Sequence, residues 1–250
     1  MSIGDARNLD CIRLILTAGV PAPWGECIKA IMHLKKIKYT AVAQLIGKRD
    51  AELREWTGQD SAPVLVLPDN RVFSSWESIL WQLETLAPDI KVIPNDIAKR
   101  IQMFGFLREF AGINGFAWNR RLQSLQAAGG PSSNEIVAVL CERYGYNDDA
   151  IERAEKTIRN MLLHCSNHLK KQAQSGSKFY VGNALSAVDI YSAIMCSIMI
   201  NPLEHSKIPM PEGMRQGYSS HSHLWSGLDE AFWQHRDFIM ANYVELPLQF

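Results

Sequence analysis

The sequence has no excess charge of either sign, because its 26 lysines and arginines are matched by 26 aspartates and glutamates among 250 residues. A chain without a strong positive field has little to attract DNA, RNA or an anionic membrane surface. We therefore expect no nucleic-acid partner and no electrostatic binding to membranes.

Long apolar runs are also missing. The longest uncharged apolar stretch, residues 190–200, is too short to cross a bilayer, which requires about 20 residues. The N-terminus carries an acid at Asp5 and lacks the apolar core of a signal peptide. The sequence predicts a soluble protein of the cytoplasm.

Metal and nucleotide signatures are absent as well. The cysteines are five, scattered and without Cys-x-x-Cys spacing, which argues against a disulfide framework or a zinc site. His164 and His168 lie four residues apart, but no metalloprotease glutamate accompanies them. His221 and His223 lack further separated ligands. No glycine-rich phosphate loop occurs, so we expect neither a metal nor a nucleotide.

What the sequence does contain is a proline at the start of an apolar run, in Ser61-Ala62-Pro63-Val64-Leu65-Val66-Leu67. Proline at the beginning of a buried strand calls for a special reason. A cis bond before Pro63 would turn the backbone N–H and C=O outward, where an extended thiol peptide could pair with them like an added strand. We predict that Pro63 is cis.

The first half of the chain alternates strands and helices. Apolar spacing predicts these elements in order: a strand over 11–16, a helix containing 27–34, a strand over 38–42, a helix over 51–56 that ends at Gly58, strands over 64–67 and 71–73, and a helix from about 74–77. The first two strands should be parallel and the last two antiparallel. This βαβαββα order is thioredoxin-like.

The second half is predicted to be all-helical. Prolines at 88 and 94 place a linker between a first domain, 1–87, and a second, 94–250. One predicted helical face in the second domain comprises Ile97, Ile101, Phe104, Leu107 and Phe110. A capping box is expected where Asp189 reaches back to Ser186, followed by an uncharged, buried helix.

A thioredoxin-like half with an Ala62-Pro63-Val64 turn, followed by an all-α half with the Ser186–Asp189 box, resembles the glutathione S-transferase superfamily over nearly the whole chain. Residues 21–26, 56–58, 235–239 and 246–248 look like a bacterial-type group of transferase-like proteins within it. The resemblance implies the two-domain architecture of that superfamily, a homodimer, and glutathione as the bound thiol.

The resemblance also implies where glutathione lies. Its cysteinyl part would pair with the backbone of Ala62, and its γ-glutamyl end would meet an acid–serine pair at the start of the third helix. If Ile79 and Leu83 are the buried positions of that helix, the pair falls on Ser75-Trp76. Matching the residue types glutamate and serine directly to the acid–serine pair places it instead on Glu77-Ser78. We favour the first register. The candidate binding residues are Ser61, Ala62, Pro63, Ser75, Trp76 and Glu77.

The residue that would activate the thiol is harder to assign, because the segment 17–27 contains no tyrosine or serine. Thr17 could donate a hydroxyl and Trp24 an indole N–H, and we take these two as the candidate catalytic residues. Cys27 shares an apolar helical repeat with Ile31 and Leu34, so we expect its thiol to be buried.

The sequence therefore favours a glutathione-binding, transferase-like protein that conjugates glutathione to a small apolar electrophile. Some aromatic residues of the second domain could line the apolar site, although we expect most of them in the core: Phe104, Phe106, Phe110, Phe116 and Trp118. Two alternatives remain open. One is a non-catalytic ligand carrier or interaction module with the same fold, and the other is a glutathione-dependent thiol reductase that uses Cys27. Whether the protein is an enzyme is not decided by the sequence.

Overall fold

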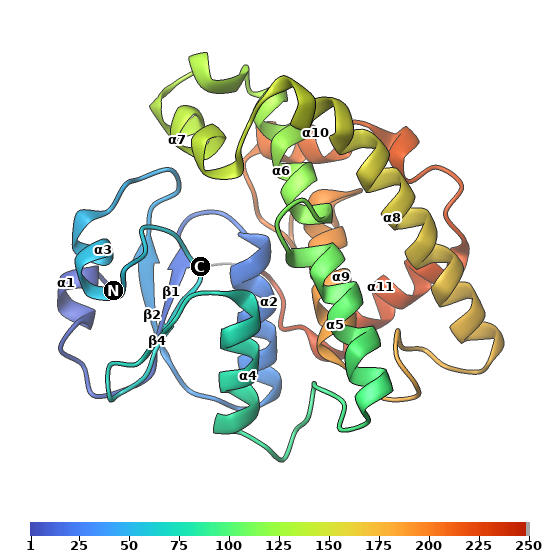
Figure 1. Cartoon of the computed structure of the whole chain (residues 1–250), viewed down its shortest axis with the longest axis horizontal. Coiled ribbons are helices and arrows are strands. Elements are labelled where there is room, and N and C mark those ends of the chain that lie inside the picture. The colour runs from blue at the N-terminus through green and yellow to red at the C-terminus, as the bar shows by residue number, and fades with distance from the viewer. Residues whose placement is uncertain (249–250) are drawn as a thin grey trace.

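The computed structural model describes residues 1–248, so the last two residues of the predicted second domain, 249 and 250, lie outside the described residues. Figure 1 shows a small sheet with flanking helices on one side of the molecule and a bundle of helices on the other. The N-terminal part is thioredoxin-like, and the C-terminal part is helical throughout. The predicted fold class is confirmed. The domain limits 1–87 and 94–250 stay a prediction.

The sheet has four strands in the order β2-β1-β3-β4. Their bounds are Arg13–Thr17 (β1), Thr40–Gln44 (β2), Val64–Val66 (β3) and Val72–Phe73 (β4). β1 pairs with β2 in parallel and with β3 antiparallel, and β3 pairs with β4 antiparallel. The predicted strand directions are therefore right, and the parallel register places the ends of β1 and β2 side by side.

Helices cover both faces of the sheet. α2 (Pro23–Leu34) and α4 (Trp76–Leu86) lie on the face toward the helical bundle, and α1 (Ile3–Ala6) and α3 (Ala51–Thr57) lie on the other (Figure 1). Successive side chains of a strand point to opposite faces. Leu14 and Leu16 accordingly pack in the core shared with α2, while Ile15 packs with Leu53 of α3.

A buried lysine fixes the linker between the two parts. The linker joins the end of α4 at Leu86 to the start of α5 (Ile97–Ala111). The Lys35 ammonium lies 2.8 Å from the Glu84 carboxylate and donates to the carbonyl of Ala87 at 3.0 Å, and the Val92 N–H donates to Glu84 at 2.9 Å. A buried cation needs such partners. These bonds hold the linker against α2 and α4.

The helical part is organised around one buried helix. It contains α5, α6 (Phe116–Ala127), α7 (Glu135–Tyr144), α8 (Asp148–Gln174), α9 (Ala187–Met199), α10 (Glu212–Ser219) and α11 (Glu230–Tyr243), with short 3-10 turns at Gly130–Ser132 and Ser222–Leu224. Every residue of α9 is buried, and α9 packs against α2, α5 and α11. No helix within residues 1–248 is long and apolar enough to span a membrane.

The start of α9 confirms the predicted capping box. Ser186 is the N-cap residue, and the Asp189 carboxylate accepts from the Ser186 N–H at 2.8 Å and from its hydroxyl at 2.8 Å. The same carboxylate also accepts from the Tyr180 N–H at 2.7 Å and lies 3.0 Å from Nε2 of His235. Asp189 therefore joins α9 to the preceding loop and to α11.

The face predicted for α5 is confirmed at Leu107 and Phe110 and wrong at Ile97 and Ile101. Ile97 and Ile101 are 65% and 68% exposed, whereas Met103, Leu107 and Phe110 are buried. The predicted set covers too wide an arc, since the thirteen positions from Ile97 to Phe110 fall about 140° short of four whole turns and so place these two side chains about 140° apart around the helix. α5 packs against α9, while Ile97 and Ile101 near its start face outward.

Candidate functional site

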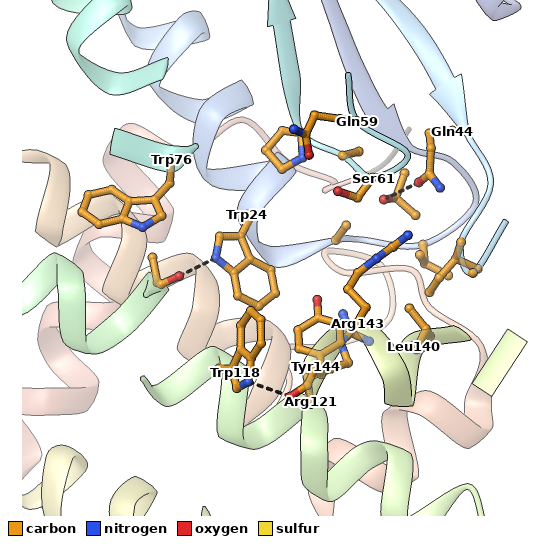
Figure 2. A pocket seen from close by; sticks show the side chains of 18 of the residues that line it. Trp24, Gln44, Gln59, Ser61, Trp76, Trp118, Arg121, Leu140, Arg143 and Tyr144 are labelled. Carbon is orange, nitrogen blue, oxygen red and sulfur yellow. Dashed lines mark hydrogen bonds between the residues drawn. The ribbon is translucent and has the colours of Figure 1, made fainter. Parts of the chain in front are cut away.

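A cavity of about 470 Å³ lies where the sheet meets α6 and α7 (Figure 2). The loop after β1, the loop after β2, the start of β3 and the N-terminus of α4 border it on one side. The end of α5 together with α6, α7 and α10 borders it on the other. Seven of the eight candidate residues line this one cavity: Thr17, Trp24, Ser61, Ala62, Pro63, Ser75 and Trp76.

The start of β3 contributes an unpaired stretch of backbone. The Ala62–Pro63 bond is cis, as predicted. Pairing between β3 and β1 begins at Val64, which is opposite Ile15. The backbone of Ala62 therefore lies beyond the ladder and borders the cavity, where its N–H and C=O can pair with an extended ligand.

The N-terminus of α4 also faces the cavity. Ser75 is the N-cap residue; its hydroxyl accepts from the Ser78 N–H at 3.0 Å, and the Ser78 hydroxyl accepts from the Ser75 N–H at 3.2 Å. The amides of Trp76 and Glu77 have no acceptor within the helix and can bind an anion. The side chain of Glu77 is exposed and does not line the cavity.

Thr17 and Trp24 lie at the cavity wall with their donors already engaged. The Thr17 hydroxyl donates to Oε1 of Gln44 at 3.3 Å, across the paired ends of β1 and β2. The Trp24 indole N–H donates to the carbonyl of Ala111 at 2.8 Å and so ties the loop after β1 to the end of α5. Both donors therefore have acceptors within the protein, and the catalytic roles of Thr17 and Trp24 stay predictions.

Cys27 does not reach the cavity. Its side chain is fully buried in the core between α2 and α9. Burial, followed by the charge of Glu26 and the neighbouring Cys196, raises the pKa of the Cys27 thiol well above its usual value. A buried, protonated thiol is a poor nucleophile, as its place in the apolar repeat suggested.

The far wall carries aromatic and basic side chains. Trp118 and Arg121 come from α6, and Leu140, Arg143 and Tyr144 come from α7 (Figure 2). The Trp118 indole N–H donates to the carbonyl of Tyr144 at 3.0 Å, which fixes the two helices to each other. The far wall therefore combines apolar aromatic rings with the positive charges of two arginines.

No family model matches this chain, and no curated protein matches its sequence. Solved structures do match. A glutathione transferase family member from Pseudomonas fluorescens with two glutathione bound has a TM-score of 0.64 at 14% identity, covering 93% of this chain and 89% of its own. A Methylobacterium radiotolerans glutathione S-transferase in complex with glutathione sulfonate has a TM-score of 0.62 at 16% identity, covering 92% and 91%.

The same likeness extends to a Xanthobacter autotrophicus glutathione S-transferase, with a TM-score of 0.62, 14% identity, and coverage of 95% of this chain and 97% of the other. This chain has the glutathione S-transferase fold. At such identities the likeness establishes the fold alone.

Within the glutathione S-transferase fold, α4 has the buried positions on which the favoured register depends, while the binding role of Ser75 and Trp76 stays a prediction. Ile79 and Leu83 are fully buried, and Ser75 and Trp76 line the cavity. Ser78 is the partner of Ser75 in the capping box and not a cavity residue. Among residues 1–248, no aspartate or glutamate lines the cavity.

Most residues of the helical wall of this cavity were not predicted from the sequence. Of the predicted aromatic set, Trp118 lines the cavity, but Phe110 and Phe116 are fully buried in the core. Arg121 follows another arginine in an ordinary polar helical pattern, and α7 carries no motif. Only the packing of α7 against the loop after β2, where Leu140 and Ile46 share one apolar cluster, brings these residues to the site.

Proposed function

We propose that this protein binds glutathione in the cavity and conjugates its thiol to a small electrophile with an apolar part. The observation that supports the proposal most is that three groups border the same cavity. They are the unpaired backbone of Ala62, the N-terminus of α4 at Ser75, and the hydroxyl of Thr17. Together they match the peptide, the carboxylate and the thiol of one tripeptide.

In the proposed complex, the cysteinyl residue of glutathione pairs with Ala62 as an added strand. The γ-glutamyl carboxylate accepts from the free amides of Trp76 and Glu77 and from the Ser75 hydroxyl. The γ-glutamyl amine meets no carboxylate from the cavity wall, because Glu77 points elsewhere. The amine is therefore expected to stay in contact with water.

Catalysis in this proposal lowers the pKa of the glutathione thiol and aligns it with the electrophile. The Thr17 hydroxyl rotates to donate to the thiolate, which favours the charged form. The sulfur then forms a bond to the electrophilic carbon, the leaving group departs with its electron pair, and the thiol proton passes to solvent.

A calorimetric titration tests the binding step. We expect glutathione to bind the wild-type protein, and Ser75→Ala to weaken binding about tenfold through loss of a hydrogen bond to a charged group. Ser2→Ala is the matched control, because it removes a helix-capping serine of α1 outside the cavity. Absence of heat with millimolar glutathione, or equal weakening by both variants, would contradict the proposed pose.

The second candidate is a non-catalytic carrier or interaction module that binds glutathione without turnover. The engaged donors of Thr17 and Trp24 favour it, because neither is already aimed at a thiol. Binding of glutathione without conjugation of any tested electrophile would select this candidate. The Cys27-based reductase is disfavoured by the burial and raised pKa of that thiol.

We further infer that the protein is a cytoplasmic homodimer. All five cysteines are free thiols, which suits a reducing compartment and is checked by cell fractionation. Trp81 of α4 and the outward Ile97 and Ile101 of α5 are exposed near one another, since Trp81 stacks on Phe104 of α5 with ring centroids 5.7 Å apart. This apolar face suits a second copy of the chain.

Sedimentation equilibrium tests the dimer. We expect a mass of twice 28.2 kDa for the wild type and a shift toward monomer in Ile101→Glu, which places a charge on the proposed interface. Ile113→Glu serves as the control, because Ile113 is equally exposed but lies at the cavity. A wild-type monomer at micromolar concentration would refute the dimer.

A further inference from the structure

The charged groups that line the cavity are both arginines, Arg121 and Arg143. Their surroundings differ. Arg143 lies 3.1 Å from the carboxylate of Asp60, which also pairs with Arg54. Burial by itself would raise the pKa of the Asp60 carboxyl, but Arg54, Arg143 and Arg49 together lower it below its usual value. The charge of Arg143 is therefore balanced within the protein.

The charge of Arg121 is not balanced in this way. Only 8% of the residue is exposed, and within residues 1–248 no carboxylate lies at ion-pair distance from it. Its Nε is buried without a hydrogen-bond partner among those residues. Its guanidinium carbon lies 5.9 Å from the centroid of the Tyr144 ring, and its described polar neighbours are the hydroxyls of Tyr218 and Tyr144, neither of which is a carboxylate. Burying a cation without a neighbouring anion costs free energy, and binding of an anionic ligand would offset that cost.

Flat aromatic surfaces surround this cation. The Tyr144 ring is 4.6 Å from the ring of Trp118 and 6.2 Å from that of Trp24, centroid to centroid. Both indole N–H groups are held by backbone carbonyls, so the rings are fixed before any ligand arrives. In Figure 2, Arg121 lies beside Tyr144 and Trp118, whereas the guanidinium of Arg143 points toward Ser61 and Gln44. Fixed rings of this kind stack well on a planar ligand.

We propose that the electrophile is an aromatic carboxylate, whose ring lies among Trp24, Trp118 and Tyr144 and whose carboxylate pairs with Arg121. This proposal rests on the proposed function, because it names the class of second substrate with which the glutathione thiol reacts. A carboxylate is favoured over a phosphate because one planar guanidinium matches a planar monoanion. A second positive charge is not available, since Arg143 is already paired with Asp60.

The probe is 4-chloro-3-nitrobenzoate, with its methyl ester as the neutral analogue of the same shape. Thiolate attack on the ring carbon that carries chlorine forms an S–C bond, breaks the C–Cl bond and releases chloride, and the thiol proton goes to solvent. Binding is measured by quenching of tryptophan fluorescence, and turnover is measured as the enzymatic rate divided by the uncatalysed rate with glutathione.

We expect the wild type to bind the carboxylate about tenfold more tightly than the ester, and Arg121→Met to remove this preference while leaving ester binding nearly unchanged. Arg121→Lys should restore part of the preference because it keeps the charge. Arg153→Met is the control, since Arg153 is an exposed arginine of α8 outside the cavity lining. Equal binding of acid and ester by the wild type would overturn the proposal.

Calorimetry with glutathione separates this proposal from the function on which it rests. Unchanged glutathione affinity in Arg121→Met, together with loss of acid preference, supports the assignment of Arg121 to the electrophile. An equal loss of glutathione affinity would assign Arg121 to the tripeptide and overturn the proposal. Arg121-dependent binding of the acid by a protein that does not bind glutathione would overturn the conjugation function while keeping the ligand class.

Discussion

Asp189→Ala should lower the free energy of unfolding by about 3–5 kcal/mol, the largest effect expected of any single substitution discussed for this chain. The Asp189 carboxylate is fully buried and accepts from the amides of Tyr180 and Ser186 and the hydroxyl of Ser186, with His235 3.0 Å away. Alanine would leave all of these groups buried without an acceptor. Urea and thermal melts followed by circular dichroism measure the loss.

Asp96→Ala is the matched control. Asp96 caps α5 by accepting from the Lys99 N–H at 2.9 Å, but it is exposed, so water replaces the lost acceptor. Loss of such a cap costs about 1 kcal/mol. Equal unfolding midpoints for the two variants would show that the buried network around Asp189 adds nothing beyond an ordinary cap.

Thr17→Val should reduce kcat/KM for glutathione conjugation by about 100-fold at neutral pH, the typical effect of removing one donor to a developing anion. The substitution keeps the shape of the side chain at the end of β1 and removes the hydroxyl. A hydrogen bond to the thiolate lowers the thiol pKa, so its loss raises that pKa. The rising limb of the pH–rate profile should therefore move to higher pH.

Cys27→Ala is the control for this experiment, because the buried Cys27 thiol is outside the cavity. It should keep most of the activity once folding is confirmed. A folded Cys27→Ala variant without activity would revive the thiol reductase, and an unshifted pH profile in Thr17→Val would exclude Thr17 as the activating group. A wild type without conjugating activity would favour the carrier.

Features encoded by neighbouring residues were predictable from the sequence. The proline at 63 and the capping box from Ser186 to Asp189 each involve residues within a few positions of one another, and both occur as expected. The strand directions were also predictable, because a strand–helix–strand unit returns in parallel whereas a short turn joins antiparallel strands. These local patterns were enough to define the fold and one side of the cavity.

Features that depend on distant packing were not predictable. The Trp24 indole was read as a free donor, yet its acceptor at Ala111 is 87 residues away. The buried face of α5 was predicted incorrectly at its start, because exposed apolar side chains such as Ile97 and Ile101 look the same in sequence as buried ones. Arg121 resembles any polar helical residue until α7 brings Tyr144 against it.

A structure of the protein with glutathione tests the central claim most directly. We expect the cysteinyl backbone to pair with Ala62, the γ-glutamyl carboxylate to lie at the N-terminus of α4 beside Ser75, and the sulfur to lie within hydrogen-bond distance of the Thr17 hydroxyl. Glutathione bound elsewhere, or an empty cavity in crystals soaked with millimolar glutathione, would contradict the account.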